Sequence, residues 1–126
     1  MRHKKKIFIP GNVPSSKNSR VFNVATKRSF PSKTVQRWKR NTDRYWKQYR
    51  DQFLCNIALD LAPYKVKFTF IRDTRRKFYY INAAQVVQDM MVQYDWLEDD
   101  NCTILWPSFG LYRVDKESAG VEIEVL

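Results

Sequence analysis

The 126-residue chain has the length of one domain, and its 44% hydrophobic content is sufficient for a buried core without a metal ion or a disulfide. Its 23 Lys and Arg against 13 Asp and Glu give a net charge of +10, which favours an anionic partner, most often nucleic acid. No stretch approaches the ~20 apolar residues of a membrane span, and no apolar signal core follows the basic residues at 2–6, so we expect an intracellular protein.

The two cysteines and the single histidine are not expected to have a functional role. Cys55 and Cys102 form no CxxC pair, so a zinc site is not expected and packing is their predicted role. The single histidine, His3, lies in a basic N-terminal segment that we expect to be frayed, and it receives no role. A basic surface that merely keeps the protein soluble remains the alternative interpretation of the charge.

The first half of the chain is predicted to hold a strand, a hairpin and a long helix. A strand is expected over 6–10, then a turn-rich loop over 11–20 and a hairpin over 21–31. Ser32 or Thr34 is the predicted N-cap of the helix. Hydrophobic residues recur at intervals of three and four, which predicts one buried face, and basic residues occupy the other side. The predicted buried face comprises Val35, Trp38, Thr42, Tyr45, Trp46, Tyr49 and Phe53.

The second half is predicted to alternate strands with a second helix. The segment 64–72 alternates, with Lys65 and Lys67 on the face opposite the hydrophobic residues, where they either meet phosphates or only solubilise the sheet. A basic loop follows over 73–77, and Asn82 is the predicted N-cap of a helix ending near Asp95. Strands are expected around 103–105, over 110–114 and over 121–126.

This order of elements predicts the fold class. A strand, a hairpin, a helix, a strand, a helix and closing strands indicate a single small α+β domain over residues 1–126. We expect a mixed or antiparallel sheet with the two main helices packed on one face, and a disordered basic terminus over residues 1–5.

An acidic run follows the second predicted helix. Glu98, Asp99 and Asp100 are consecutive, and Asp89 lies nine residues before Glu98 on that helix. Mg²⁺ takes hard oxygen ligands, usually carboxylates with waters and phosphate oxygens, and nucleases use it to activate water. Acidic triplets in loops are usually solvated, but basic clusters at 17–20, 27–28, 37–50 and 65–77 would bring phosphates to this one. A metal site beside bound DNA and a solvated loop therefore both remain open.

Three segments together resemble the RusA-type Holliday junction resolvases, small endonucleases of phages and prophages. They are "FIPGNVPSSKNSR", "SFPSKTVQRWKR" and "RRKFYYINAAQVVQDMMVQYDWLEDDN", and the resemblance extends over nearly the whole chain. It implies a RusA-like α+β fold, a homodimer, and Mg²⁺-dependent paired nicking of four-way DNA junctions in the cytoplasm of a bacterial host. DNA recombination and repair are the processes that such an activity serves.

The resemblance also assigns site residues. Asp100 matches the family's late metal-binding aspartate, Asp99 is its acidic neighbour, and Asn82 ends the first half of the signature. Asp100 and Asp99 are the predicted metal ligands, and Asp89 joins them as a predicted catalytic residue, with Glu98 as an alternative substitute ligand. The predicted DNA-binding residues are Lys17, Arg20, Lys27, Arg28, Arg75, Arg76 and Lys77.

The chain departs from the family signature at three positions. The two early aspartates fall on Tyr79 and Ile81, and a lysine of the following helix falls on Gln85. Neither Tyr79 nor Ile81 replaces a carboxylate ligand, since neutral tyrosine has a pKa near ~10 and binds Mg²⁺ poorly. The sequence therefore predicts a degraded site that holds Mg²⁺ weakly or not at all.

Three functional hypotheses remain open on the sequence. The first is a junction endonuclease in which Asp99 and Asp100 hold Mg²⁺ and Gln85 orients water. The second is a catalytically inactive branched-DNA-binding protein, in which Tyr79 and Tyr80 either stack on unpaired bases or pack in the core. The third is a phage interaction protein that binds another protein. Candidates for a dimer interface, against the alternative of an internal core, are Met90, Met91, Tyr94 and Trp96.

Overall fold

The main sheet has five strands and mixed direction. In the computed structural model, which describes residues 4–15, 20–23, 25 and 28–126, the strand order is β1-β7-β4-β5. β1 (Ile7–Pro10) and β7 (Gly120–Val125) pair antiparallel, and β7 pairs antiparallel with the central β4 (Tyr64–Arg72). β5 (Leu105–Phe109) and the short β6 (Arg113–Val114) both pair parallel with β4, β6 at its far end.

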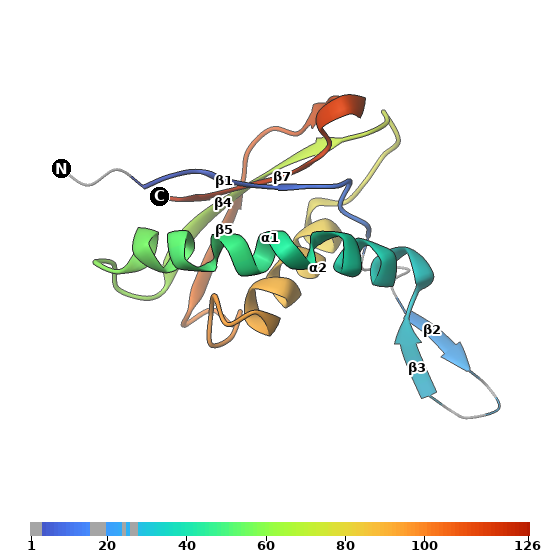
Figure 1. Cartoon of the computed structure of the whole chain (residues 1–126), viewed down its shortest axis with the longest axis horizontal. Helices are drawn as coiled ribbons and strands as arrows, with labels where there is room; N and C mark the ends of the chain where they lie inside the picture. The colour runs from blue at the N-terminus through green and yellow to red at the C-terminus, as the bar shows by residue number, and fades with distance from the viewer. Residues whose placement is uncertain (1–3, 16–19, 24, 26–27) are drawn as a thin grey trace.

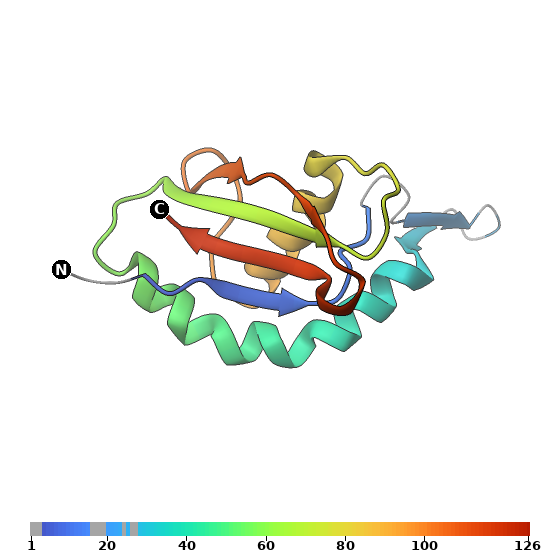
Figure 2. The ribbon, with the colours of Figure 1, turned by 90° about the horizontal axis from the view of Figure 1, so that it is seen from above.

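Two helices cover the same face of this sheet. α1 (Lys33–Ile57) runs along the β1 side, and α2 (Tyr80–Gln93) lies beside it beneath β4 and β5 (Figures 1 and 2). A short 3₁₀ turn, η2 (Lys116–Ser118), precedes β7. The predicted fold class is therefore confirmed: a small α+β domain with a mixed sheet and both main helices on one face.

A separate hairpin precedes α1. β2 (Arg20–Asn23) pairs antiparallel with β3 (Arg28–Pro31), and for both strands only the backbone is described. The pair lies away from the main sheet, at the N-terminal end of α1 (Figure 1). The predicted hairpin over 21–31 is confirmed in place and in pairing.

α1 is anchored by its cap and by one buried stripe. The Ser32 side chain accepts a hydrogen bond from the Val35 backbone N–H at 3.3 Å, so Ser32, rather than Thr34, is the N-cap. Five of the seven residues predicted for the inner face are buried, while Tyr45 and Tyr49 are half-buried at its margins. Burial of these large side chains stabilises the helix against the sheet by about 1.5–3 kcal/mol each.

The core lies between the helices and the sheet. Val66, Phe68 and Phe70 of β4 are fully buried, as the alternating pattern predicts. Trp96, just after α2, donates its indole N–H to the Trp46 backbone carbonyl at 2.8 Å, which joins the two helices through a buried hydrogen bond. Met90 and Met91 are also fully buried, so they belong to the internal core of the chain. They offer no exposed surface for a dimer interface.

Ion pairs cover the opposite face of the sheet. Lys67 pairs with Glu124 at 3.6 Å, and the Lys65 ammonium lies 4.9 Å from the centre of the Trp106 ring. These contacts within the chain favour the solubilising interpretation of Lys65 and Lys67. Among the described residues, no helix is long and apolar enough to cross a membrane.

Five predictions differ in detail from the structure. α2 begins at Tyr80 with Tyr79 as its cap residue, so Asn82 lies in the first turn and is not the N-cap. The strand expected around 103–105 begins only at Leu105, and that expected over 110–114 shrinks to Arg113–Val114. Both cysteines are exposed instead of packed. Within the predicted disordered terminus, residues 1–3 lie outside the described chain, but Lys4 pairs with Asp60 at 2.5 Å.

Candidate functional site

The predicted catalytic residues partly converge on the exposed side of α2. Gln85 and Asp89 lie one helical turn apart, and the Gln85 amide nitrogen donates to Asp89 Oδ1 at 2.7 Å. The same nitrogen lies 3.5 Å from Asp100 Oδ2, which comes from the loop after the helix. We call Gln85, Asp89 and Asp100 the acidic–amide cluster.

The electrostatics of the acidic–amide cluster centre on Asp100. Partial burial raises the pKa of Asp100, and the neighbouring charges of Asp89 and Asp99 raise it further. Gln85 contributes a hydrogen-bond donor but no positive charge, so it leaves this repulsion largely in place. A cation beside Asp100 would favour its ionised form.

Asp99 makes its hydrogen bonds within its own turn, and its predicted role as a metal ligand stays a prediction. Its two carboxylate oxygens accept hydrogen bonds from the Asp100 backbone N–H at 2.8 Å and from the Asn101 side chain at 2.9 Å. The Asn101 side-chain bond, followed by the backbone bond, lowers the pKa of Asp99. Asp99 therefore stabilises the turn that carries Asp100, and each of its carboxylate oxygens accepts one hydrogen bond within that turn.

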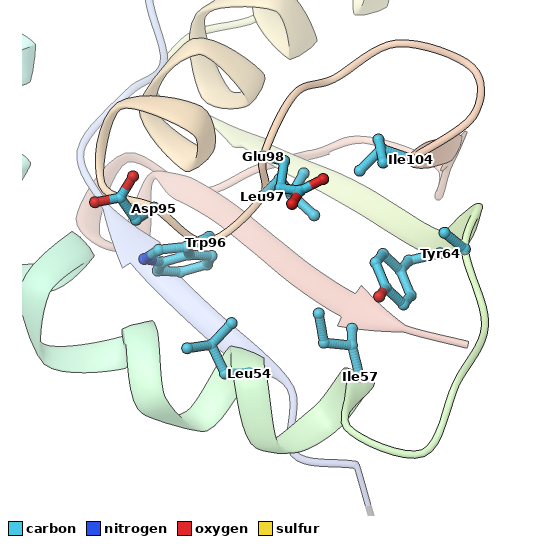
Figure 3. A pocket seen from close by; sticks show the side chains of 9 residues that line it. Leu54, Ile57, Tyr64, Asp95, Trp96, Leu97, Glu98 and Ile104 are labelled. Carbon is cyan, nitrogen blue, oxygen red and sulfur yellow. The ribbon is translucent and has the colours of Figure 1, made fainter.

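Glu98, the alternative ligand, lines a different surface. It borders a pocket of about 440 Å³ whose apolar walls include Leu54, Ile57 and Ile104 (Figure 3). Leu97, next to Glu98 in the chain, is buried in the same wall. No contact joins Glu98 to the acidic–amide cluster in the part of the chain that the structure describes, so the prediction of Glu98 as a substitute ligand gains no support.

The positions of the missing early aspartates are open to solvent. Tyr79 is 64% exposed and Ile81 76% exposed at the start of α2. Ile81, Gln85 and Asp89 follow at four-residue spacing along the exposed side of the helix. A carboxylate at 81 would thus stand in line with the acidic–amide cluster, whereas position 79 lines the basic–aromatic side of the helix start, and this chain has a carboxylate at neither.

The donor set does not match the Mg²⁺ site that the resemblance implies. Within the described ranges, no three His, Cys, Asp or Glu side chains are grouped so that they could hold a metal ion. Asp89 and Asp100 approach one another, the carboxylate of Asp99 is engaged in its own turn, and 79 and 81 supply no oxygen ligand. The residues present therefore do not fit a Mg²⁺ site of the family type.

A second candidate site lies at the N-terminal end of α2. Basic and aromatic side chains line a pocket of about 230 Å³ there, which we call the basic–aromatic pocket. The first residues of α2 carry no acidic side chain, so the positive end of the helix dipole adds to the basic charge. The pocket is lined by Arg75, Arg76, Lys77, Phe78, Tyr79, Tyr80 and Tyr112.

Ring contacts fix the aromatic wall of this pocket. Phe78 packs edge-on against Tyr80 and Tyr112, with ring centres 5.1 and 5.3 Å apart. The Tyr80 hydroxyl accepts a hydrogen bond from the Tyr112 backbone N–H at 3.3 Å, and the Arg72 guanidinium lies 4.5 Å from the Phe78 ring centre. Phe70 continues the cluster into the core, and the partly exposed Phe109 packs against Tyr80 at its edge.

The predicted DNA-binding residues fall into three groups: those at the pocket, those on the hairpin and those outside the described residues. Arg75, Arg76 and Lys77 are exposed together at the basic–aromatic pocket. Arg20 and Arg28 lie on the paired strands of the hairpin, whose side chains are not described. Lys17 and Lys27 lie outside the described residues.

Sequence reasoning missed Tyr112. It lies more than thirty residues from the basic run and reaches the pocket because β6 pairs with the end of β4 that leads into the 73–77 loop. The available signal was an exposed tyrosine beside Arg113 in a predicted closing strand, but no local pattern links that strand to the loop. No protein-family model matches the chain and no characterised protein matches it, so the family resemblance remains a prediction from the motifs.

Proposed function

We propose that this protein binds branched DNA, four-way junctions above all, and that it is a RusA-type relative whose metal site is degraded. The observation that carries the proposal is the basic–aromatic pocket. Arg75, Arg76 and Lys77 offer charge for phosphates, and Tyr79 and Tyr112 offer partly exposed rings beside them. Sites for unpaired nucleotides combine these two features, since bases stack on rings while cations hold the backbone.

The unstacked bases at a DNA branch point are the ligand that suits the basic–aromatic pocket. Bases at a junction unstack more readily than bases inside a duplex, and each base stacked on an aromatic ring contributes about 1–3 kcal/mol to binding. A homodimer, which the resemblance implies, would present two such pockets to the two-fold symmetric junction. Branch recognition therefore requires no metal ion.

The acidic–amide cluster supports the second half of the proposal. Gln85 joins Asp89 and Asp100 by hydrogen bonds where a metal site would offer free carboxylate oxygens. Tyr79 and Ile81, at the two positions to which the resemblance assigns aspartates, supply no carboxylate ligand. We therefore assign this cluster to the surface that adjoins bound DNA and derive no cleavage step from it.

The binding test compares a labelled four-way junction with a linear duplex of the same sequence, in Ca²⁺. Wild type is expected to bind the junction more tightly. Arg75→Gln/Arg76→Gln/Lys77→Gln should lower the salt dependence of log K by about 2.7 for three lost phosphate contacts. Lys65→Gln/Lys67→Gln, on the opposite sheet face, is the charge control. Equal affinity of wild type for junction and duplex would refute branch recognition.

The cleavage test uses Mg²⁺ or Mn²⁺ with the same junction. No paired nicks are expected from wild type. Tyr79→Asp/Ile81→Asp/Gln85→Lys should gain nicking, which Asp100→Asn in that background should abolish, while Tyr79→Asn/Ile81→Asn/Gln85→Lys controls for size without charge. Paired nicks from wild type that disappear in Asp100→Asn would show that the site is intact and the second half of the proposal wrong.

A further inference from the structure

The outer face of α1 carries a row of basic side chains. They recur at intervals of four and three residues, and all of them are exposed. At about 3.6 residues per turn, they lie opposite the buried stripe that contains Val35, Trp38 and Trp46. This row, the α1 basic stripe, consists of Lys33, Arg37, Arg40, Arg44 and Lys47.

Most of this charge is not neutralised within the chain. Lys33, Arg37 and Arg40 have no hydrogen-bond or ion-pair partner among the described residues. Arg44 bonds to the Tyr45 hydroxyl at 2.6 Å, and Lys47 pairs with Asp43 at 3.1 Å. The segment 33–47 holds six basic residues and one acidic residue, so it carries half of the chain's net charge of +10.

The opposite face of the molecule shows a different arrangement. There Lys6 and Arg113 pair with Glu122 at 3.3 and 2.7 Å, and Lys67 pairs with Glu124 at 3.6 Å. The two glutamates of β7 thus offset two of these three positive charges on the open sheet face. Half of the net charge of the protein therefore lies along α1, at the edge of the molecule (Figure 2).

We propose that the α1 basic stripe holds the phosphate backbone of a DNA duplex arm, separately from the branch point held at the basic–aromatic pocket. This inference rests on the proposed function and deepens it. The stripe is about 21 Å long at 1.5 Å per residue, which is more than half of one duplex turn of about 34 Å. Flexible Lys and Arg stems along such a row reach successive phosphates on one strand.

The composition of the α1 basic stripe favours phosphate groups as its ligand. It contains no apolar or aromatic side chain, because the apolar face of α1 is buried against the sheet. A helix that binds a membrane surface needs that apolar face free, and base readout needs a helix or strand placed within a groove. A row of exposed cations is suited to phosphates, which hold a protein in position without reading sequence.

The test distinguishes the α1 basic stripe from the basic–aromatic pocket by comparing binding to a linear duplex with binding to a four-way junction. Arg37→Gln/Arg40→Gln should weaken binding to a linear duplex and to a four-way junction by the same factor. The slope of log K against log salt between about 50 and 200 mM should fall by about 1.8 for both substrates. Arg75→Gln/Arg76→Gln/Lys77→Gln should instead reduce the preference for the junction over the duplex.

The matched control is Lys65→Gln/Lys67→Gln, which removes the same charge from the paired sheet face, and circular dichroism checks the fold of each variant. Equal changes of slope in both double variants would overturn the inference, because net charge alone would then explain the loss. The inference would also be overturned if Arg37→Gln/Arg40→Gln kept the wild-type slope of log K against log salt. The proposed function would still stand in that case, provided that the pocket variant loses its preference for the junction. Failure of wild type to bind any DNA, with binding to phosphatidylserine vesicles, would overturn both.

Discussion

The side-chain amide of Gln85 lies 2.7 Å from Asp89 Oδ1 and donates a hydrogen bond to it. The same nitrogen reaches toward Asp100, so one neutral group links two carboxylates in a strongly basic protein. The resemblance implies a lysine at this position, which would add the positive charge that the two carboxylates lack. The charge at position 85 therefore controls the electrostatics of the acidic–amide cluster.

Gln85→Lys is expected to lower the pKa of Asp100, because an ammonium group nearby favours the ionised carboxylate. It should stabilise the protein at neutral pH by less than about 1 kcal/mol, since the pair is near the surface. Carboxyl ¹³C NMR titration measures the first effect and urea unfolding the second. Gln85→Met keeps the length of the side chain without a donor or charge, and an Asp100 titration unchanged by lysine would contradict the expectation.

Tyr94 links the end of α2 to α1 and should make stability depend on alkaline pH. Its hydroxyl donates to Asp43, and burial together with this bond raises the pKa of Tyr94 to about 12. Because the folded pKa lies above the unfolded value near ~10, the contribution of Tyr94 is complete below pH ~10 and is lost as pH rises toward 12. Urea unfolding across that window should show the loss in wild type.

Tyr94→Phe removes the ionisable group and is the control for that titration. The variant should lose less stability between pH ~10 and 12 than wild type. Its absorbance titration should lack the ionisation step of Tyr94 near pH 12. Identical pH profiles for wild type and Tyr94→Phe would show that the bond to Asp43 does not persist in solution.

The Trp96–Trp46 contact is expected to be the most sensitive point of the core. Trp96→Ala should cost about 3–5 kcal/mol, since it leaves a large cavity between the helices. Trp96→Phe keeps most of the ring volume but removes the indole hydrogen bond to the Trp46 carbonyl, which keeps its place in the helical ladder, so we expect a cost of about 0.5–1.5 kcal/mol. Chemical unfolding followed by circular dichroism measures both, and a neutral Trp96→Phe would mean that water replaces the indole.

The cap of α1 offers a paired test. Ser32→Ala should destabilise the protein by about 1 kcal/mol, because the Val35 N–H loses its acceptor. Thr34→Ala removes the hydroxyl of the other candidate cap, which is exposed inside the first turn, and should change stability by no more than about 0.5 kcal/mol. Urea midpoints decide between them, and a larger cost for Thr34→Ala would reverse the assignment.

Most of the fold could be predicted because its signals are local. The three- and four-residue spacing of Val35, Trp38, Thr42 and Trp46 predicts the inner face of α1, and alternation predicts the buried face of β4. The start of α2 could not be predicted in the same way. Asn82 is a favourable cap residue, but Phe78 and Tyr80 pack into the aromatic cluster, and this tertiary contact extends the helix back to Tyr80.

The candidate site was predictable only in part, for a related reason. The four-residue spacing of Gln85 and Asp89 places both on one side of a helix, but the approach of Asp100 depends on the turn that Asp99 and Asn101 stabilise. The pocket depends on pairing between β6 and β4, which brings Tyr112 beside Arg75. Such long-range pairing leaves no trace in a local sequence pattern.

The two longer edge strands of the main sheet each contain a proline, Pro10 in β1 and Pro107 in β5. Proline has no backbone N–H, so neither edge presents an unbroken row of donors to an incoming strand. Edge-to-edge aggregation is thereby disfavoured, even when many copies are concentrated along one nucleic acid. A second copy of the chain would then have to associate through side-chain contacts, and the two sheets would remain separate.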